Sequence, residues 1–269
     1  MKNTPILTKE IKKKYKFKKV NNKKKPLRNI PFNLINMFTM DGKIKIKNWY
    51  IDDTYLSKKP KIYTEKQIIF FIKKIENRKT KYYGRTDLAL YKALEKYSIN
   101  GKRVVIMGSN CPWYESICLY HKGECTIVDY NKIISKDPRL KTMTVSEYDK
   151  NPIIFDVGIS ISSFEHDGLG RYGDPIDPEG DLKAMNKMKT IIKKNGLLFL
   201  SVPTGKDLLV WNAHRIYGKI RFPLLIKGWK LLETFEVKEN WFKKKCRGIF
   251  NKIWGHMHGP QPVFVLKNI

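Results

Sequence analysis

The feature that most constrains this chain is a strand–turn–helix–strand unit predicted between Arg103 and Asn131. A mostly apolar strand, Arg103–Met107, leads into the turn Gly108-Ser109-Asn110, and a proline then opens a helix that runs to residue 121. The second strand, Glu124–Asp129, ends in a carboxylate. Such units build a parallel sheet with helices on both faces, and the ligand of such a sheet lies beyond the carboxyl ends of its strands.

The same alternation of strand and helix patterns continues to the end of the chain. The further elements predicted are strands at residues 43–47, 141–145, 153–161, 197–202, 229–237 and 262–266 and helices at 63–75, 87–97, 179–194 and 207–217. The last two strands have no helix between them, which indicates an antiparallel addition at one edge of the sheet. The predicted fold class is therefore α/β, with a seven-stranded, mostly parallel, Rossmann-like sheet.

Basic residues are concentrated at the N-terminus of the chain. The net charge is +29, and residues 1–28 contain a single acidic residue, Glu10, among many lysines. We predict a basic, partly disordered extension over residues 1–60 and one domain over residues 61–269, with its core at 101–266. The extension is interpreted either as a solvated tail or as a contact to an anionic membrane surface or nucleic acid. Lysine far outnumbers arginine, whereas arginine is the residue that base readout favours.

The sequence shows neither a membrane-spanning pattern nor a cysteine motif. No apolar run approaches the length that crosses a bilayer, and the first residues lack the apolar core of a secretory signal. The four cysteines, at positions 111, 118, 125 and 246, form no CxxC pair. We interpret them as packed thiols and expect a cytoplasmic protein.

The turn after the first strand of the unit has the properties of an adenosine-binding turn. Gly108, Ser109 and Asn110 let the backbone approach a ligand, and the helix that follows directs its N-terminal amides toward it. Asp129 ends the next strand, where a carboxylate accepts both ribose hydroxyls; its alternative role is to cap the turn before Asn131. The remaining residues predicted to bind the cofactor are Tyr130, Ser160 and Ser162.

This turn differs from a typical glycine-rich loop. It contains one glycine, and Pro112-Trp113 adds bulk directly after it. We interpret it as a modified loop that still binds the cofactor; the alternative is a degenerate site. A literal GxGxxG occurs at residues 168–173, but it does not lie directly between a strand and a helix, so it is not interpreted as a dinucleotide fingerprint.

Several segments resemble the motifs of known families. Phe155–His166 is similar to the fourth-strand motif of small-molecule methyltransferases, and Ile191–Pro203 is similar to their fifth-strand motif. Three further segments, Ser162–Pro175, Gly180–Met185 and Asn212–Gly218, resemble an uncharacterised domain-of-unknown-function family. That family was first described from nematode proteins and is also present among bacterial polysaccharide genes. The likeness covers about residues 82–235. It implies a fold of the class I S-adenosylmethionine-dependent methyltransferases, with S-adenosylmethionine (SAM) as the cofactor.

Two groups of polar residues are candidates for chemistry. Methyl transfer to a hydroxyl needs an aligned acceptor and a group that removes a proton. His166, in the loop after the fourth strand, is one candidate base, and Arg171 in the same loop suits a polyhydroxylated or anionic acceptor. His214 is the other candidate base, and on a helix over 207–217 it would share a face with Tyr217. The alternative for each is a structural role in a loop brace or a buried polar network.

The function predicted from these features is SAM-dependent O-methylation of a sugar or glycan hydroxyl. One alternative is a nucleic-acid ribose methyltransferase, which the net charge suggests, and another is a non-catalytic nucleotide-binding or scaffold module with a degenerate loop. Base N-methylation is disfavoured, because the segment Ser162-Ser-Phe-Glu stands where those enzymes carry Asn/Asp-Pro-Pro-aromatic. No metal site is expected, since the spacing of Asp167, Asp174, Asp177 and Asp181 matches no recognised ligand set.

Overall fold

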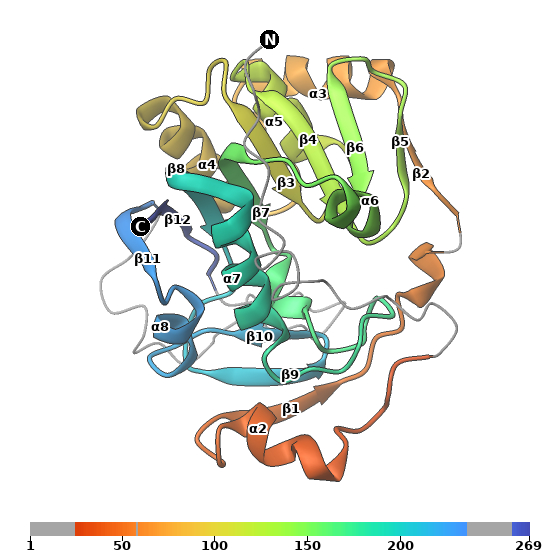
Figure 1. Ribbon diagram of the computed structural model, residues 1–269, viewed down its shortest axis with the longest axis vertical. Coiled ribbons are helices and arrows are strands. Elements are labelled where there is room, and N and C mark those ends of the chain that lie inside the picture. Colours follow the sequence, from red (N-terminus) through yellow and green to blue (C-terminus); the bar gives the residue numbers. More distant parts are fainter. Residues whose placement is uncertain (1–24, 58, 236–259) are drawn as a thin grey trace.

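The computed structural model describes residues 25–57, 59–235 and 260–269, and its main feature is a seven-stranded sheet (Figure 1). The strand order is β11 (Trp229–Phe235), β12 (Val263–Asn268), β8 (Ile192–Ser201), β7 (Phe155–Ile161), β3 (Arg103–Met107), β4 (Glu124–Asp129) and β6 (Leu140–Thr144). β12 is antiparallel to both of its neighbours, and all other neighbouring pairs are parallel. This is the α/β fold of the class I SAM-dependent methyltransferases, and it confirms the predicted fold class.

Helices cover both faces of the sheet. Those on one face are α3 (Glu65–Glu76), α4 (Arg85–Lys96) and α5 (Trp113–Tyr120), and those on the other are α6 (Val145–Lys150), α7 (Gly180–Ile191) and α8 (Arg221–Leu225). Successive strand residues point to opposite faces. Val104 and Ile106 of β3 therefore pack in the first hydrophobic cluster, while Val105 and Met107 pack in the second. Burial on both faces explains why these strands appear in the sequence as continuous apolar runs.

Two smaller sheets and several short elements surround the main sheet. β1 (Lys45–Trp49), β9 (Leu208–Asn212) and β10 (His214–Ile216) form a three-stranded sheet, which lies below the main sheet in Figure 1. β2 (Lys61–Tyr63) pairs in parallel with β5 (Ile133–Ser135). The short helical elements are η1 (Phe32–Leu34), α2 (Ile35–Thr39), η2 (Thr54–Ser57) and η3 (Phe164–His166).

The prediction of a helix over residues 207–217 was wrong, because this segment forms β9 and β10. All five residues of β9 are buried, and a continuous apolar run does not by itself distinguish a buried strand from a buried helix. The partner that decides between them is distant in sequence: β1 pairs in parallel with β9, with Lys45 opposite Leu208. His214 and Tyr217 therefore do not share a helix face.

The described part of the N-terminal region packs on this three-stranded sheet. Phe38 and Ile44 contact Leu209 and Trp211 of β9 in a separate hydrophobic cluster, and the Trp211 indole donates to the carbonyl of Leu27 at 3.2 Å. Residues 1–24 of the predicted tail lie outside the described residues, as do positions 236–237 of a predicted strand and the cysteine at 246. The domain boundary at residue 60 stays a prediction. No helix in the described ranges is both long enough and apolar enough to cross a membrane.

Candidate functional site

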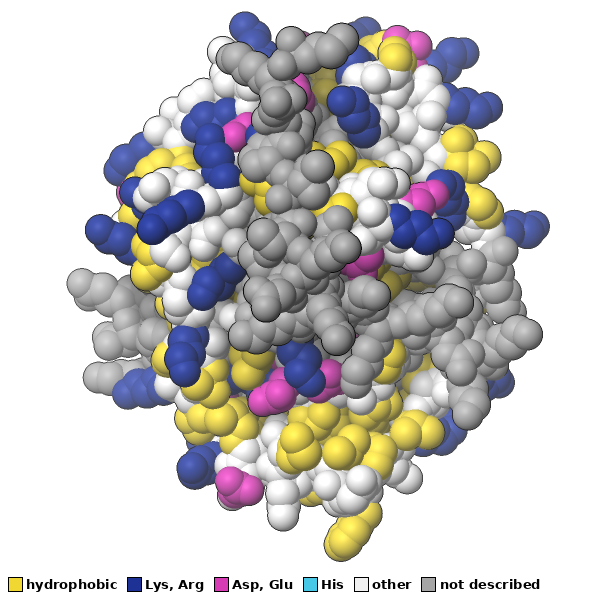
Figure 2. Space-filling view, in the orientation of Figure 1, with side chains coloured by type: hydrophobic (Ala, Val, Ile, Leu, Met, Phe, Trp, Pro, Cys, Tyr) yellow, Lys and Arg dark blue, Asp and Glu magenta, His cyan; other side chains and the backbone are white. Residues whose placement is uncertain are grey.

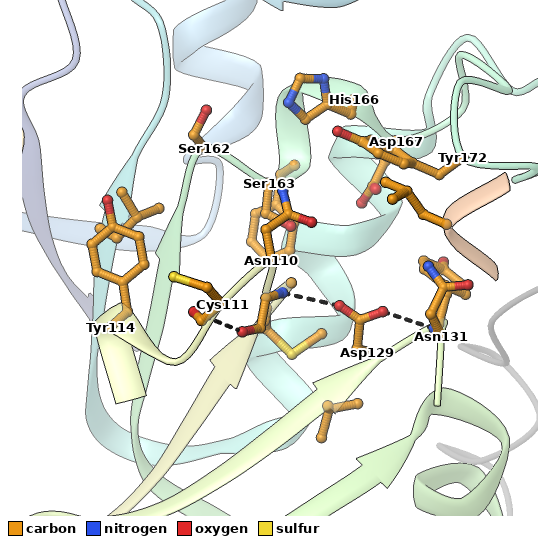
Figure 3. Close-up of a pocket in the computed structure, with 18 of the residues that line it drawn as sticks. Asn110, Cys111, Tyr114, Asp129, Asn131, Ser162, Ser163, His166, Asp167 and Tyr172 are labelled. Atoms are coloured by element: carbon orange, nitrogen blue, oxygen red, sulfur yellow. Dashed lines mark hydrogen bonds between the residues drawn. The ribbon is translucent and has the colours of Figure 1, made fainter. Parts of the chain in front are cut away.

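A pocket lies at the carboxyl ends of β3, β4 and β7 (Figure 3). From β3 the chain proceeds to β4 on one side, and it later returns to β7 on the other side. This reversal of strand order is the place where open α/β sheets bind ligands. The cavity has a volume of about 150 Å³, and its walls come from the β3–α5 turn, the end of β4, the loop after β7 and the segment that contains Leu56 and Lys61.

The turn between β3 and α5 forms one wall of this pocket. Gly108 has a φ of +75°, and a Cβ atom at this position would lie 2.5 Å from Ser163 Oγ in the loop after β7. The single glycine is therefore required both by backbone conformation and by the close approach of the two loops. The Tyr63 hydroxyl lies 2.7 Å from Ser109 Oγ, so β2 supports the turn from outside.

Asp129 is bound to the turn and also faces the pocket (Figure 3). Its Oδ2 accepts a hydrogen bond from the Ser109 amide at 2.9 Å, and its Oδ1 accepts one from the Asn131 amide at 2.7 Å. The cap role and the ligand role are thus compatible, because each carboxylate oxygen has a second lone pair. A ribose diol suits the two remaining acceptor positions.

Six of the seven residues predicted to bind the cofactor line this pocket, namely Gly108, Ser109, Asn110, Asp129, Tyr130 and Ser162. The seventh, Ser160, is fully buried within β7 and is not part of the lining. The lining therefore offers a backbone turn, a carboxylate and polar side chains on this side of the pocket. This donor and acceptor set fits an adenosine-containing cofactor such as SAM.

His166 lies in η3, directly after β7, and lines the same pocket. Its Nδ1 lies 2.6 Å from the carbonyl oxygen of Ala213, so Nδ1 carries the proton and Nε2 is left with a lone pair. Burial lowers the pKa of His166 well below its ordinary value, and the nearby positive charge of Arg171 and the ring of His214 lower it further. His166 is therefore a neutral imidazole with an unprotonated Nε2.

Glu165 is a buried carboxyl group beside this imidazole. Its Oε1 accepts a hydrogen bond from the Ser162 hydroxyl at 2.6 Å and lies 3.8 Å from His166 Nε2. Burial raises the pKa of Glu165 to about 7. Glu165 was not among the predicted site residues, although it directly precedes His166 in the sequence.

The other three candidate catalytic residues do not line the pocket. His214 is buried on β10, and its ring centroid lies 6.3 Å from that of His166. Arg171 forms an ion pair with Asp53, with 2.7 Å between Nε and Oδ2. The Tyr217 hydroxyl is fully buried and donates to Asp181 at 2.9 Å. The structure thus brings His166 alone of the four to the pocket, and a catalytic role for the other three stays a prediction.

The loop after β7 is held from behind by a buried ionic network. Arg215 Nη1 donates to the carbonyl oxygen of Asp167 at 2.6 Å, and Arg221 binds Asp181 through Nε at 2.8 Å. Within the GxGxxG of this loop, the amides of Gly168 and Gly170 donate to the carboxylate of Asp174. Those amides are engaged by the chain itself, which agrees with the view that this motif is not a dinucleotide fingerprint.

The described residues between β1 and β2, 49–57 and 59–61, lead from the three-stranded sheet to the pocket. Ile51 is bound by the side chain of Asn212, which accepts from its amide at 2.8 Å and donates to its carbonyl at 3.0 Å. Leu56 and Lys61 then line the pocket. No local pattern indicated these two wall residues, because their contribution depends on pairings with distant strands.

Comparison with known proteins identifies the family. The sequence model described as "Caenorhabditis protein of unknown function, DUF268" matches residues 101–251. The chain belongs to this family. No curated protein matches the chain.

Solved structures similar to this chain include three bacterial proteins. A 1,6-didemethyltoxoflavin-N1-methyltransferase from Burkholderia thailandensis is 13% identical, with 69% of this chain and 79% of that chain covered and a TM-score of 0.46. The N-methyltransferase NodS from Bradyrhizobium japonicum is 12% identical, with 68% of this chain and 94% of that chain covered and a TM-score of 0.43. TehB from Haemophilus influenzae is 12% identical, with 74% of this chain and 67% of that chain covered and a TM-score of 0.47. The fold assignment itself rests on the strand order and orientation of the sheet.

Proposed function

We propose that this protein is a SAM-dependent O-methyltransferase whose acceptor is a sugar or glycan hydroxyl. The observation that carries the proposal is the position of His166. His166, whose Nε2 is unprotonated, lines the same pocket as the Gly108 turn and Asp129. A proton acceptor and an adenosine-binding edge in one cavity are what methyl transfer to a hydroxyl requires.

When bound, the cofactor would supply a methyl group activated by its sulfonium, and its S–CH₃ bond would break, leaving a neutral thioether, as the O–C bond to the acceptor forms. Gly108, Ser109 and Asp129 would hold its adenosine part, and the loop after β7 would position the acceptor. His166 Nε2 would take the hydroxyl proton, while Nδ1 stays bound to the Ala213 carbonyl and fixes the ring.

The proton on His166 needs compensation, because burial and Arg171 disfavour the imidazolium. Glu165 provides it, since its Oε1 lies 3.8 Å from His166 Nε2 and its pKa of about 7 lets it exist in either protonation state near neutrality. An ionised Glu165 would therefore compensate the imidazolium by its charge, since 3.8 Å exceeds hydrogen-bond distance.

The composition of the pocket supports a polyhydroxylated acceptor. The tyrosines that line it are Tyr82, Tyr83, Tyr114, Tyr130 and Tyr172. A tyrosine ring packs on the apolar face of a sugar, and its hydroxyl supplies a hydrogen bond at the rim of the same contact. The tyrosine lining is therefore the feature from which we infer a sugar.

A nucleic-acid ribose methyltransferase is the second candidate, favoured by the net charge of +29. On the described surface of the face shown in Figure 2, however, Lys and Arg side chains are distributed widely and do not form one stripe. A non-catalytic module is the third candidate, because the turn at Gly108 has a single glycine.

Transfer of a labelled methyl group from SAM distinguishes these candidates. The acceptors are a panel of mono- and oligosaccharides and, separately, unmodified RNA. We expect label in the sugar fraction that treatment with base does not release. His166→Gln should reduce the rate of transfer roughly 100- to 10,000-fold, the range of general-base catalysis. Label in RNA alone would replace the proposal with the second candidate. Transfer to no acceptor at all, with SAM bound, would favour the third.

A further inference from the structure

Lys61 is the cation of the pocket. Its backbone amide donates to the carbonyl of Lys132 at 3.1 Å, which anchors β2 beside β5. Its side chain reaches the turn after β3, where Nζ donates to the carbonyl oxygen of Ser109 at 2.5 Å and to Oδ1 of Asn110 at 3.0 Å. A long side chain from a strand outside the main sheet thus ends at the turn that forms the pocket wall.

Within the described residues, Lys61 is the one lysine or arginine that lines the pocket. Arg171 lies in the adjacent loop, but its guanidinium is bound to Asp53 and to the carbonyl of Ala213. The Asp129 carboxylate also lines the cavity and disfavours an anionic ligand beside it. An anionic group on a ligand therefore has one favourable position, beside Lys61 Nζ.

The backbone of Ser109 is hydrogen-bonded to an acidic side chain through its amide and to a basic side chain through its carbonyl. Its amide donates to Asp129 and its carbonyl accepts from Lys61. A lysine ammonium has three N–H donors, and the two hydrogen bonds it makes in the described part of the chain leave one for a ligand. The turn thus presents a carboxylate from one side and an ammonium donor from the other.

We infer that Lys61 binds the carboxylate of the amino-acid part of SAM, while Asp129 binds its ribose. This inference rests on the proposed function. The cofactor carries an α-carboxylate at one end and an adenosine at the other, and the pocket offers one cation for the former. A charge-assisted hydrogen bond between an ammonium and a carboxylate is about twice as strong as a neutral one.

The assignment makes cofactor binding depend on a residue outside the family match at 101–251. The residues that precede the match would then be part of the binding site and not a dispensable extension. Lys61 would also link occupancy of the pocket to the segment that carries Asp53 and Leu56.

Calorimetry with three ligands tests the assignment on the full chain. The ligands are S-adenosylhomocysteine, 5′-methylthioadenosine, which lacks the amino-acid part, and adenosine monophosphate. We expect Lys61→Gln to weaken S-adenosylhomocysteine binding roughly 10- to 100-fold, the scale of a lost hydrogen bond to a charged group, and to leave methylthioadenosine unchanged. Lys61→Arg should retain most of the affinity. Lys66→Gln, an exposed lysine on α3, is the matched control and should change neither.

The outcomes separate this inference from the proposed function. An equal loss for both adenosyl ligands in Lys61→Gln would show that Lys61 only supports the turn, and would overturn the inference. An unchanged affinity for S-adenosylhomocysteine would overturn it as well. Tighter wild-type binding of adenosine monophosphate than of methylthioadenosine, lost in Lys61→Gln, would identify the anion as a phosphate instead of a carboxylate. If the wild-type protein binds neither adenosyl ligand, the proposed function itself fails.

Discussion

Removal of the Asp181 carboxylate is expected to destabilise the domain strongly. This side chain is fully buried on α7, and Arg221 binds it through Nε at 2.8 Å and Nη2 at 2.6 Å. The Tyr217 hydroxyl donates to it at 2.9 Å, and Arg215 Nε lies 3.7 Å away. Asp181→Ala would leave two buried guanidinium groups without their counter-ion, and these two groups hold the loop that carries His166.

The expected cost follows from that geometry. Removing one partner of a buried ion pair typically costs about 3–5 kcal/mol, out of a total stability of about 5–15 kcal/mol. Urea unfolding followed by circular dichroism measures it as a lower midpoint. The matched control is Glu179→Ala, an exposed carboxylate two residues earlier at the N-cap of α7, whose contact with Lys183 spans 3.6 Å, where the change should stay below about 1 kcal/mol. A loss below about 1 kcal/mol for Asp181→Ala would refute the reasoning.

The same carboxylate gives the stability a pH dependence with a definite sign. Burial alone would raise the pKa of Asp181, but Arg215, Arg221 and the Tyr217 hydroxyl more than offset it, and the pKa lies below its ordinary value. A depressed folded-state pKa stabilises the native state above the unfolded pKa and loses that effect as the pH falls through the folded value. We therefore expect wild-type stability to fall in acid below about pH 4, and less steeply in Asp181→Asn.

Two further predictions concern the pocket itself. Gly108→Ala places a Cβ 2.5 Å from Ser163 Oγ at a residue with a φ of +75°. We expect the stability to fall by about 1–2 kcal/mol from the backbone conformation alone, and S-adenosylhomocysteine binding to weaken. Unchanged affinity in calorimetry would show that the turn does not contact the ligand. Glu165 has a pKa raised to about 7, so the folded state holds a proton that the unfolded state releases, and wild-type stability should fall as the pH rises from about 4 to 7. Glu165→Gln should remove that decline in urea unfolding series at several pH values, and an unaltered pH profile would contradict the buried, proton-binding state of this residue.

Local pattern was sufficient to predict the β3–α5–β4 part of the fold. β3 and β4 have the predicted bounds because each is a short apolar run between turn residues, and the turn at Gly108 lies where the glycine indicates. Asp129 could be assigned to the pocket from the end of its strand, since parallel strands present their carboxyl ends at one edge of a sheet.

The surroundings of His166 and Lys61 could not be predicted in the same way. The environment of His166 depends on the Ala213 carbonyl, which is placed by the β9–β10 hairpin, and β9 is a strand because β1 pairs with it from far away in the sequence. The role of Lys61 depends likewise on the pairing of β2 with β5. Neither long-range pairing leaves a periodic signal in the local sequence.

Calorimetric titration of the wild-type protein with S-adenosylhomocysteine tests the central claim, that this pocket binds SAM. We predict saturable binding with one site per chain, weakened by about 1.5–3 kcal/mol in Asp129→Ala, where the ribose would lose hydrogen bonds to a charged group. Asp129→Asn, which keeps one acceptor oxygen, should lose less. A folded wild-type protein that shows no binding heat over the micromolar to millimolar range would contradict the account.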